Sequence, residues 1–179
     1  SHPEEMVEQA AALGHSACAI ADTCTLAGIV RAHVAAKAAN IPLAVGSRLR
    51  LEIHSTETVP TLDVLTFATS RASYSRLSRV ITLGKRRAPK GECALSLLDL
   101  LENHRDLLAV IIPPRWIGDD LLAAFEALRA SFDDDRISLA VWREHGPDDR
   151  ASLARAAAIS AHTRIPLVAV NDVHYHTPS

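Results

Sequence analysis

The residues best suited to chemistry lie near the carboxyl end of the chain, in the run DVHYH at 172–176. Alternate residues of an extended segment face the same way, so Asp172, His174 and His176 could point at one site. Carboxylates and imidazoles are ligands for divalent cations such as Zn2+, Mn2+ and Mg2+. The alternative is structural, with Asp172 capping a loop and both histidines on the surface. His174 carries more weight than His176, which lies closer to the chain end.

A second carboxylate, Asp22, follows a short apolar segment at 17–21. If both segments are strands of one sheet, Asp22 and Asp172 belong to strand ends at which loops converge. Cys24 lies two residues after Asp22 and could be a soft metal ligand, although a small packed thiol is the other interpretation.

The segment GKRRAPKG at 84–91 is predicted to be a loop. Its cations could contact phosphate groups or form a solvated charged run; they are Lys85, Arg86, Arg87 and Lys90. The chain contains no G-x-x-x-x-G-K-[ST], G-x-G-x-x-G or G-x-S-x-G motif, so P-loop, Rossmann and hydrolase-elbow functions lack support.

The elements that must position these residues alternate along the chain. Apolar periodicity and capping residues predict a first helix from near residue 3 to Leu13. Further helices are predicted at about 26–39, 70–83, 95–103, 119–130 and 147–163. Short apolar runs predict strands at 17–21, 42–53, 62–68, 107–112, 137–142 and 167–170, the second with a break at Gly46-Ser47. This alternation favours an α/β domain with a mostly parallel sheet, barrel-like or open and doubly wound.

Composition limits the function classes. The chain has 179 residues, a net charge of −2 and 4% aromatic residues. One domain is expected, and neither a DNA-coating basic domain nor a platform for stacking single-stranded bases is favoured. Three cysteines without a CxxC motif indicate reduced thiols, which is typical of the cytoplasm. No apolar run reaches the roughly 18 residues of a membrane span, and no secretory signal opens the chain.

Four segments together resemble a known family. They are AIADTCTLAGIVRAHVAAK at 19–37, VGSRLRLE at 45–52, GKRRAPKGE at 84–92 and PLVAVNDVHYH at 166–176. The chain resembles the N-terminal PHP (polymerase and histidinol phosphatase) domain of bacterial C-family DNA polymerases of the DNA polymerase III alpha type, and most of all the error-prone branch. The resemblance implies a distorted, TIM-like (β/α)7 barrel with a metal cluster at the strand ends. Metal-binding members act as phosphoesterases or 3′–5′ exonucleases.

The sequence departs from the ligand pattern that this family implies. The first strand, which carries H-x-H, is absent from the chain, so residues 1–179 are expected to form a single PHP domain fragment. Thr23 stands where the motif has His, and Arg48 replaces the Glu ligand in Gly46-Ser47-Arg48. Asp22, Asp172 and His174 match the pattern. Catalytic zinc needs about three protein ligands, and a nearby cation repels a metal. We therefore expect a degenerate metal site in which Arg48 pairs with Asp22 or Asp172 and supplies the missing positive charge.

Three functions remain open from the sequence, and the third of them is a plain α/β binding module. The first is a structural and interaction module of an error-prone, translesion DNA polymerase of the cytoplasm, with no catalytic or cofactor-binding residue of its own. Mg2+-dependent nucleotidyl transfer and the grip on DNA would then reside in the rest of the polymerase chain. The second is a PHP-class phosphoesterase or exonuclease that uses a divalent metal. No membrane partner is expected, and the open edge left by a missing strand could pair with a second copy.

Overall fold

The computed structural model describes residues 2–53, 60–114, 118–133, 135–143 and 146–171. Its helices are α1 (Pro3–Ala12), α2 (Ile29–Ala38), α3 (Arg71–Arg87), α4 (Leu97–Asn103), α5 (Asp119–Ser131) and α6 (Asp149–Thr163). Its strands are β1 (Cys18–Ile20), β2 (Leu43–Glu52), β3 (Thr61–Ala68), β4 (Leu95–Ser96), β5 (Leu107–Ile112), β6 (Ile137–Val141) and β7 (Leu167–Ala169). None of the helices in these ranges is long and apolar enough to cross a membrane.

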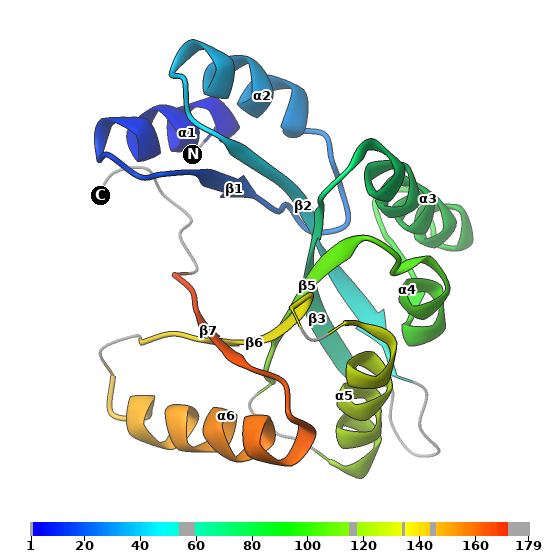
Figure 1. The fold of residues 1–179 in the computed structure, drawn as a ribbon. Coiled ribbons are helices and arrows are strands. Elements are labelled where there is room, and N and C mark those ends of the chain that lie inside the picture. The colour runs from blue at the N-terminus through cyan, green and yellow to red at the C-terminus, as the bar shows by residue number, and fades with distance from the viewer. Residues whose placement is uncertain (1, 54–59, 115–117, 134, 144–145, 172–179) are drawn as a thin grey trace.

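The strands form one curled sheet in the order β1-β2-β3-β5-β6-β7, with β4 paired to β2. The sheet curls into a partial barrel, and β1 and β7 face each other across its open side (Figure 1). The expected α/β architecture with a barrel-like sheet is therefore confirmed. β1 and β7 are also the two end strands of the part of the sheet that the structure describes.

One strand departs from the parallel arrangement that the alternation predicts. β3 runs antiparallel to both of its neighbours, β2 and β5, whereas the other pairs are parallel. β2 ends at Glu52 and β3 begins at Thr61, so the connection between them is residues 53–60. A parallel pair needs a crossover of a dozen or more residues, so a connection this short requires an antiparallel neighbour.

The helices cover the convex face of the sheet (Figure 1). A larger core cluster joins α3, α4, α5 and α6 to the sheet through residues such as Leu49, Val64 and Phe125. A smaller cluster packs α1 and α2 on β1 and the start of β2, with Val7 and Ala32 fully buried. These two clusters pack the helices against the sheet from outside the barrel.

Side chains alternate between the two faces of a strand, and this alternation identifies the residues on the concave face of the sheet. In β2, Leu49 and Leu51 belong to the larger core, so Arg48 and Arg50 lie on the inner, concave face. The register pairs Arg50 with Asp63 of β3 and Asp63 with Ile112 of β5. Arg48, Arg50 and Asp63 therefore share the inner face at the level where the parallel strand β5 ends.

Two local features depend on single contacts. The capping box of α1 uses His2 and Glu5, because the backbone N–H of His2 donates to Glu5 Oε2 at 2.7 Å. β2 runs without a break through Gly46, where a Cβ would lie 2.5 Å from the ring of Phe67. Gly46 thus allows close packing within a continuous strand and does not interrupt it.

Candidate functional site

Asp22 lies just after β1, at the carboxyl end of that strand. Its carbonyl oxygen accepts hydrogen bonds from the Arg48 N–H at 3.1 Å and the Ser47 hydroxyl at 2.8 Å. Its carboxylate faces the start of α2, since a Cβ on Gly28 would lie 2.9 Å from Asp22 Oδ2. Within the ranges that the structure describes, the Asp22 side chain has no hydrogen bond or ion pair. Its backbone is fixed, whereas its carboxylate is exposed beside a helix N-terminus, where negative charge is favourable.

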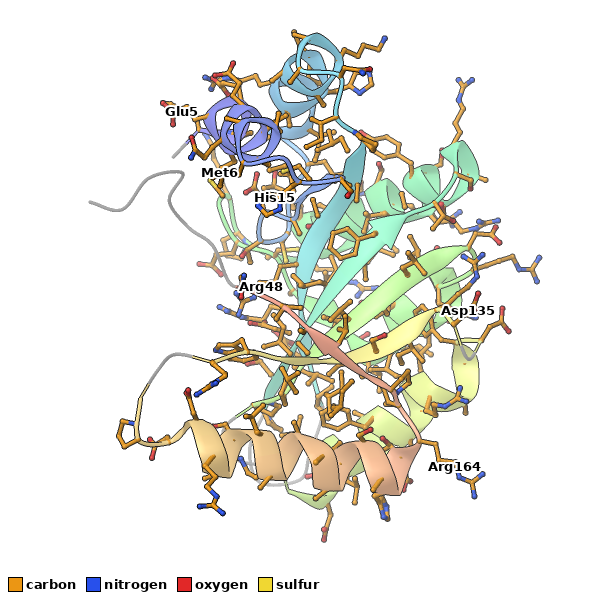
Figure 2. The ribbon with its side chains drawn as sticks, turned by 60° about the vertical axis from the view of Figure 1, so that its left-hand side comes forward. Glu5, Met6, His15, Arg48, Asp135 and Arg164 are labelled. Carbon is orange, nitrogen blue, oxygen red and sulfur yellow. The ribbon has the colours of Figure 1, made fainter. Side chains whose placement is uncertain are left out.

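The side chain of Arg48 binds a carboxylate that the sequence interpretation did not consider. Arg48 Nη2 lies 2.7 Å and Nε 2.9 Å from Asp63 Oδ2, so the guanidinium is held by β3 and not by Asp22. Pairing with Asp22 was therefore the wrong expectation. Asp172, the other expected partner, lies outside the described residues, as do His174 and His176. Figure 2 shows Arg48 on the face of the sheet turned away from α3.

Asp63 is shared by two guanidinium groups. Arg50 donates to Asp63 Oδ1 from Nε at 3.0 Å and to Oδ2 from Nη2 at 3.2 Å. The Asp63 side chain is 14% exposed, and this burial alone would raise its pKa. The hydrogen bonds and positive charges of Arg50 and Arg48 outweigh burial, so the pKa of Asp63 is below its ordinary value. The cluster Arg48–Asp63–Arg50 thus carries one net positive charge at the mouth of the partial barrel.

This arrangement does not fit a divalent metal within the described part of the site. No group of three His, Cys, Asp or Glu side chains that could hold a metal occurs in the ranges that the structure describes. Asp63 already satisfies two cations, and a metal would have to displace them against their repulsion. No chemical step through a metal is derived from these residues.

Cys24 is a packed thiol in the structure. It is 6% exposed in the larger core cluster, and its sulfur lies 3.7 Å from the carbonyl oxygen of Arg48. Burial and the neighbouring Cys24 thiol raise the pKa of Cys93 to about 11. A thiol with such a pKa stays protonated near neutral pH and is a poor ligand and nucleophile.

The basic segment 84–91 is only partly the expected loop, because residues 84–87 are helical and residues 88–91 form a bend and a turn. α3 continues through Gly84 to Arg87, so Lys85 and Arg86 lie on its last turn. Position 84 needs a glycine inside the helix, because a Cβ there would lie 2.6 Å from the sulfur of Cys93 and 2.7 Å from Leu95. This glycine permits close packing of α3 on β4 and does not act as a terminator.

Arg87 has a structural partner. Its guanidinium lies 2.5 Å from Asp99, which is 5% exposed and also accepts the Ser96 N–H at 2.9 Å. Lys85 and Arg86 have no ion pair within the described ranges. The four cations assigned to phosphate contact therefore differ in availability, because Arg87 is already neutralised.

Sequence reasoning missed Asp63 and Arg50 as members of the cluster. The signal was present in the alternation of RLRLE at 48–52, which places Arg48 and Arg50 on one face of a strand. Nothing in the sequence specified that β3 would place Asp63 opposite Arg50 on that face.

A cavity of about 380 Å³ was also not expected. It lies between Pro113-Pro114 after β5, Trp142 after β6 and the first turns of α6. Beside it, Arg143 Nε lies 3.6 Å from Asp149 of α6. The cavity adjoins the same end of the sheet as the charged cluster.

Comparison with known families decides the assignment. Residues 1–150 match the PHP domain family. The chain belongs to the PHP domain family. It is 40% identical over 195 residues to an error-prone DNA polymerase of Aromatoleum aromaticum and 38% identical over 183 residues to one of Bradyrhizobium sp.. These alignments cover 100% and 99% of this chain, which spans only 16% of the length of each relative.

Solved structures confirm the fold class of this PHP domain. A protein of Bifidobacterium adolescentis described as a metal-dependent phosphoesterase has a TM-score of 0.66 at 16% identity, over 99% of this chain and 83% of that one. An amidohydrolase of Chromobacterium violaceum has a TM-score of 0.64 at 16% identity, over 97% of this chain and 82% of that one. At this identity the likeness concerns the fold alone.

Proposed function

We propose that this PHP domain is a structural and interaction module of an error-prone DNA polymerase. The ion-paired cluster Arg48–Asp63–Arg50 at the barrel mouth supports the proposal, because arginine stands where the family pattern implies a metal-ligating glutamate. A guanidinium there crosslinks β2 to β3 through charge-assisted hydrogen bonds. The same position then serves stability instead of metal chemistry.

The proposal assigns the remaining functions to the longer polymerase. Template-directed nucleotidyl transfer, its Mg2+ ions and the main grip on DNA would lie in the rest of that chain, which is this domain's partner. The relatives' names and the sixfold difference in length support this assignment. Copying of damaged DNA in the cytoplasm follows from the same assignment. Self-association through the edges of β1 and β7 at the open side of the partial barrel is part of the same proposal.

Metal titration tests the structural role. Calorimetric titration of the chain with Zn2+ and Mn2+ is expected to give no stoichiometric binding, and a phosphodiester substrate is expected to remain intact with either ion. The Arg48→Ala variant serves as a comparison, since it removes one of the two guanidinium groups that bind Asp63. About one equivalent of metal per wild-type chain, with phosphodiesterase activity that Asp22→Asn abolishes, would overturn the proposal in favour of a PHP-class hydrolase.

A second measurement tests the assignment to a polymerase. In the longer polymerase that contains this domain, Arg48→Ala is expected to lower the temperature of thermal unfolding. It should leave the rate of primer extension per folded molecule within about twofold of wild type, since the barrel mouth takes no part in the chemistry. A large fall in that rate at unchanged stability would contradict a structural role.

A further inference from the structure

Helix α3 carries an unbalanced positive charge. The segment 71–90 contains seven Lys or Arg residues and no Asp or Glu, although the whole chain has a net charge of −2. Two of these cations are neutralised by neighbours: Arg76 lies 2.9 Å from Asp106, and Arg87 lies 2.5 Å from Asp99. Five cations remain without a counter-charge in the described ranges. Positive charge is therefore concentrated on this segment, although the net charge of the whole chain is −2.

Three of the unpaired cations form a row on the solvent side of α3. The buried side of the helix is defined by Ser73, Leu77, Val80, Ile81 and Gly84. At about 3.6 residues per turn, the opposite side carries Arg71, Ser75, Arg79, Thr82 and Arg86, and all five are exposed. α3 lies on the outside of the partial barrel, and no other described helix or strand lies over its outer side (Figure 1).

The polar side chains between the arginines are short and bind the backbone of α3, so they do not project beyond the helix surface. The Ser75 hydroxyl donates to the Arg71 carbonyl oxygen at 3.1 Å, and the Thr82 hydroxyl donates to the Ser78 carbonyl oxygen at 2.8 Å. Both short side chains thus turn back to their own helix. The three longer arginine side chains project from this side of the helix and can contact one extended ligand.

Helix stability does not explain Arg71 and Arg79. Arg71 lies in the first turn of α3, where a cation opposes the helix dipole. Arg79 has Ser75 and Leu83 four residues away on either side, so it gains no support from an acidic neighbour. Only the cations of the last turn, such as Arg86, are favoured by the dipole.

We propose that this row, Arg71, Arg79 and Arg86, binds the phosphodiester backbone of a nucleic acid. From Arg71 to Arg86 the helix rises fifteen times by about 1.5 Å, so the row is about 22 Å long. That length matches about six phosphates along one strand of B-form DNA. Guanidinium forks suit phosphate oxygens, and contacts of this kind position a strand without reading its sequence. The binding belongs to the domain itself, whatever larger protein contains it.

An acidic protein fits this face less well. Stable protein interfaces have an apolar centre inside a polar rim. The centre of the α3 face holds Ser75, Arg79 and Thr82, with no apolar side chain among them. A ligand that presents evenly spaced negative charge matches the row better than one that needs apolar burial.

Fluorescence anisotropy on the full 179-residue chain tests the assignment. The probes are a labelled oligothymidylate and a labelled duplex of about 20 nucleotides each, titrated between about 50 and 200 mM NaCl. The test variant combines Arg71→Gln, Arg79→Gln and Arg86→Gln. The matched control removes the same charge from other exposed cations on α2 and α6, with Lys37→Gln, Arg150→Gln and Arg155→Gln.

The α3 variant is expected to bind on the order of 100-fold more weakly at about 0.1 M salt, and its slope of log affinity against log salt should fall by about two to three. The control variant should lose less than about threefold, and circular dichroism should show both variants folded. No binding by the wild type at about 50 mM salt, or equal losses in the two variants, would overturn the proposal. Polyglutamate that competes as well as DNA per unit charge would also overturn it in favour of an acidic protein partner.

Discussion

The charge on Asp63 should determine the stability of the barrel mouth, and Asp63→Asn isolates that charge. The substitution keeps the size of the side chain but leaves two guanidinium groups facing each other without a counter-charge. Exposed ion pairs contribute about 0–1 kcal/mol, and removal of one partner from a buried pair costs about 3–5 kcal/mol. Asp63 is 14% and Arg48 24% exposed, so the site lies between these limits. We expect the free energy of unfolding to fall by about 2 kcal/mol.

Denaturant unfolding at several pH values provides the assay. The pKa of Asp63 is lowered in the folded state, so its carboxylate stabilises the fold above the unfolded pKa of about 3.9. That stability is lost as the pH falls through the lower folded value. Asparagine does not titrate, so the difference between wild type and Asp63→Asn should be full near pH 7 and should close in acid. A thermal midpoint lower by about 4–8 °C near pH 7 is the corresponding calorimetric result.

The control is Asp133→Asn, which removes an exposed carboxylate with no side-chain partner within the described ranges. It should change the free energy of unfolding by less than about 0.5 kcal/mol at any pH. A difference for Asp63→Asn that persists unchanged in acid would mean that packing, not charge, accounts for it. No difference at neutral pH would refute the structural role of the cluster.

Three further results are expected. Gly84→Ala should lower the free energy of unfolding by about 1–3 kcal/mol because its Cβ would meet the sulfur of Cys93, whereas Gly118→Ala, with open space around it, should be nearly neutral in the same thermal unfolding assay. Asp99→Asn should cost about 2 kcal/mol near pH 7, and this loss should shrink in acid because burial is outweighed by Arg87 and the pKa of Asp99 is lowered. Alkylation of Cys93 with iodoacetamide should be slow near pH 7 and should accelerate towards pH 11, since its pKa is raised to about 11; rapid reaction at neutral pH would contradict this.

Most of the fold could be predicted because the local signals agree with the tertiary structure. Apolar runs bounded by polar residues located the strands, and the predicted helix 119–130 matches α5 to within a residue. Gly84 misled the prediction, since a glycine permits close approach as well as helix termination, and only the packing of Cys93 against α3 distinguishes the two. The direction of β3 likewise depends on which strands become neighbours, which no local pattern encodes.

The site was predicted less well for a related reason. The sequence showed that Arg48 replaces a ligand, whereas the structure places this residue inside β2 with its guanidinium bound to Asp63 of β3. The identity of its partner depends on cross-strand register, which pairs Arg50 with Asp63 and brings the carboxylate to Arg48. A one-residue shift in that register would move Asp63 to the other face of the sheet.

The cluster also explains why one substitution would not rebuild a metal site. Arg48→Glu would restore the residue type that the family pattern implies, but Arg50 would remain bound to Asp63 through two hydrogen bonds. The new glutamate would then lie beside an arginine on the same face of β2 and could pair with it. A metal would have to compete with that guanidinium for both carboxylates. Both arginines would therefore have to change before the inner face carried enough negative charge to bind a divalent cation. Two substitutions, and not one, would be needed to restore a metal site.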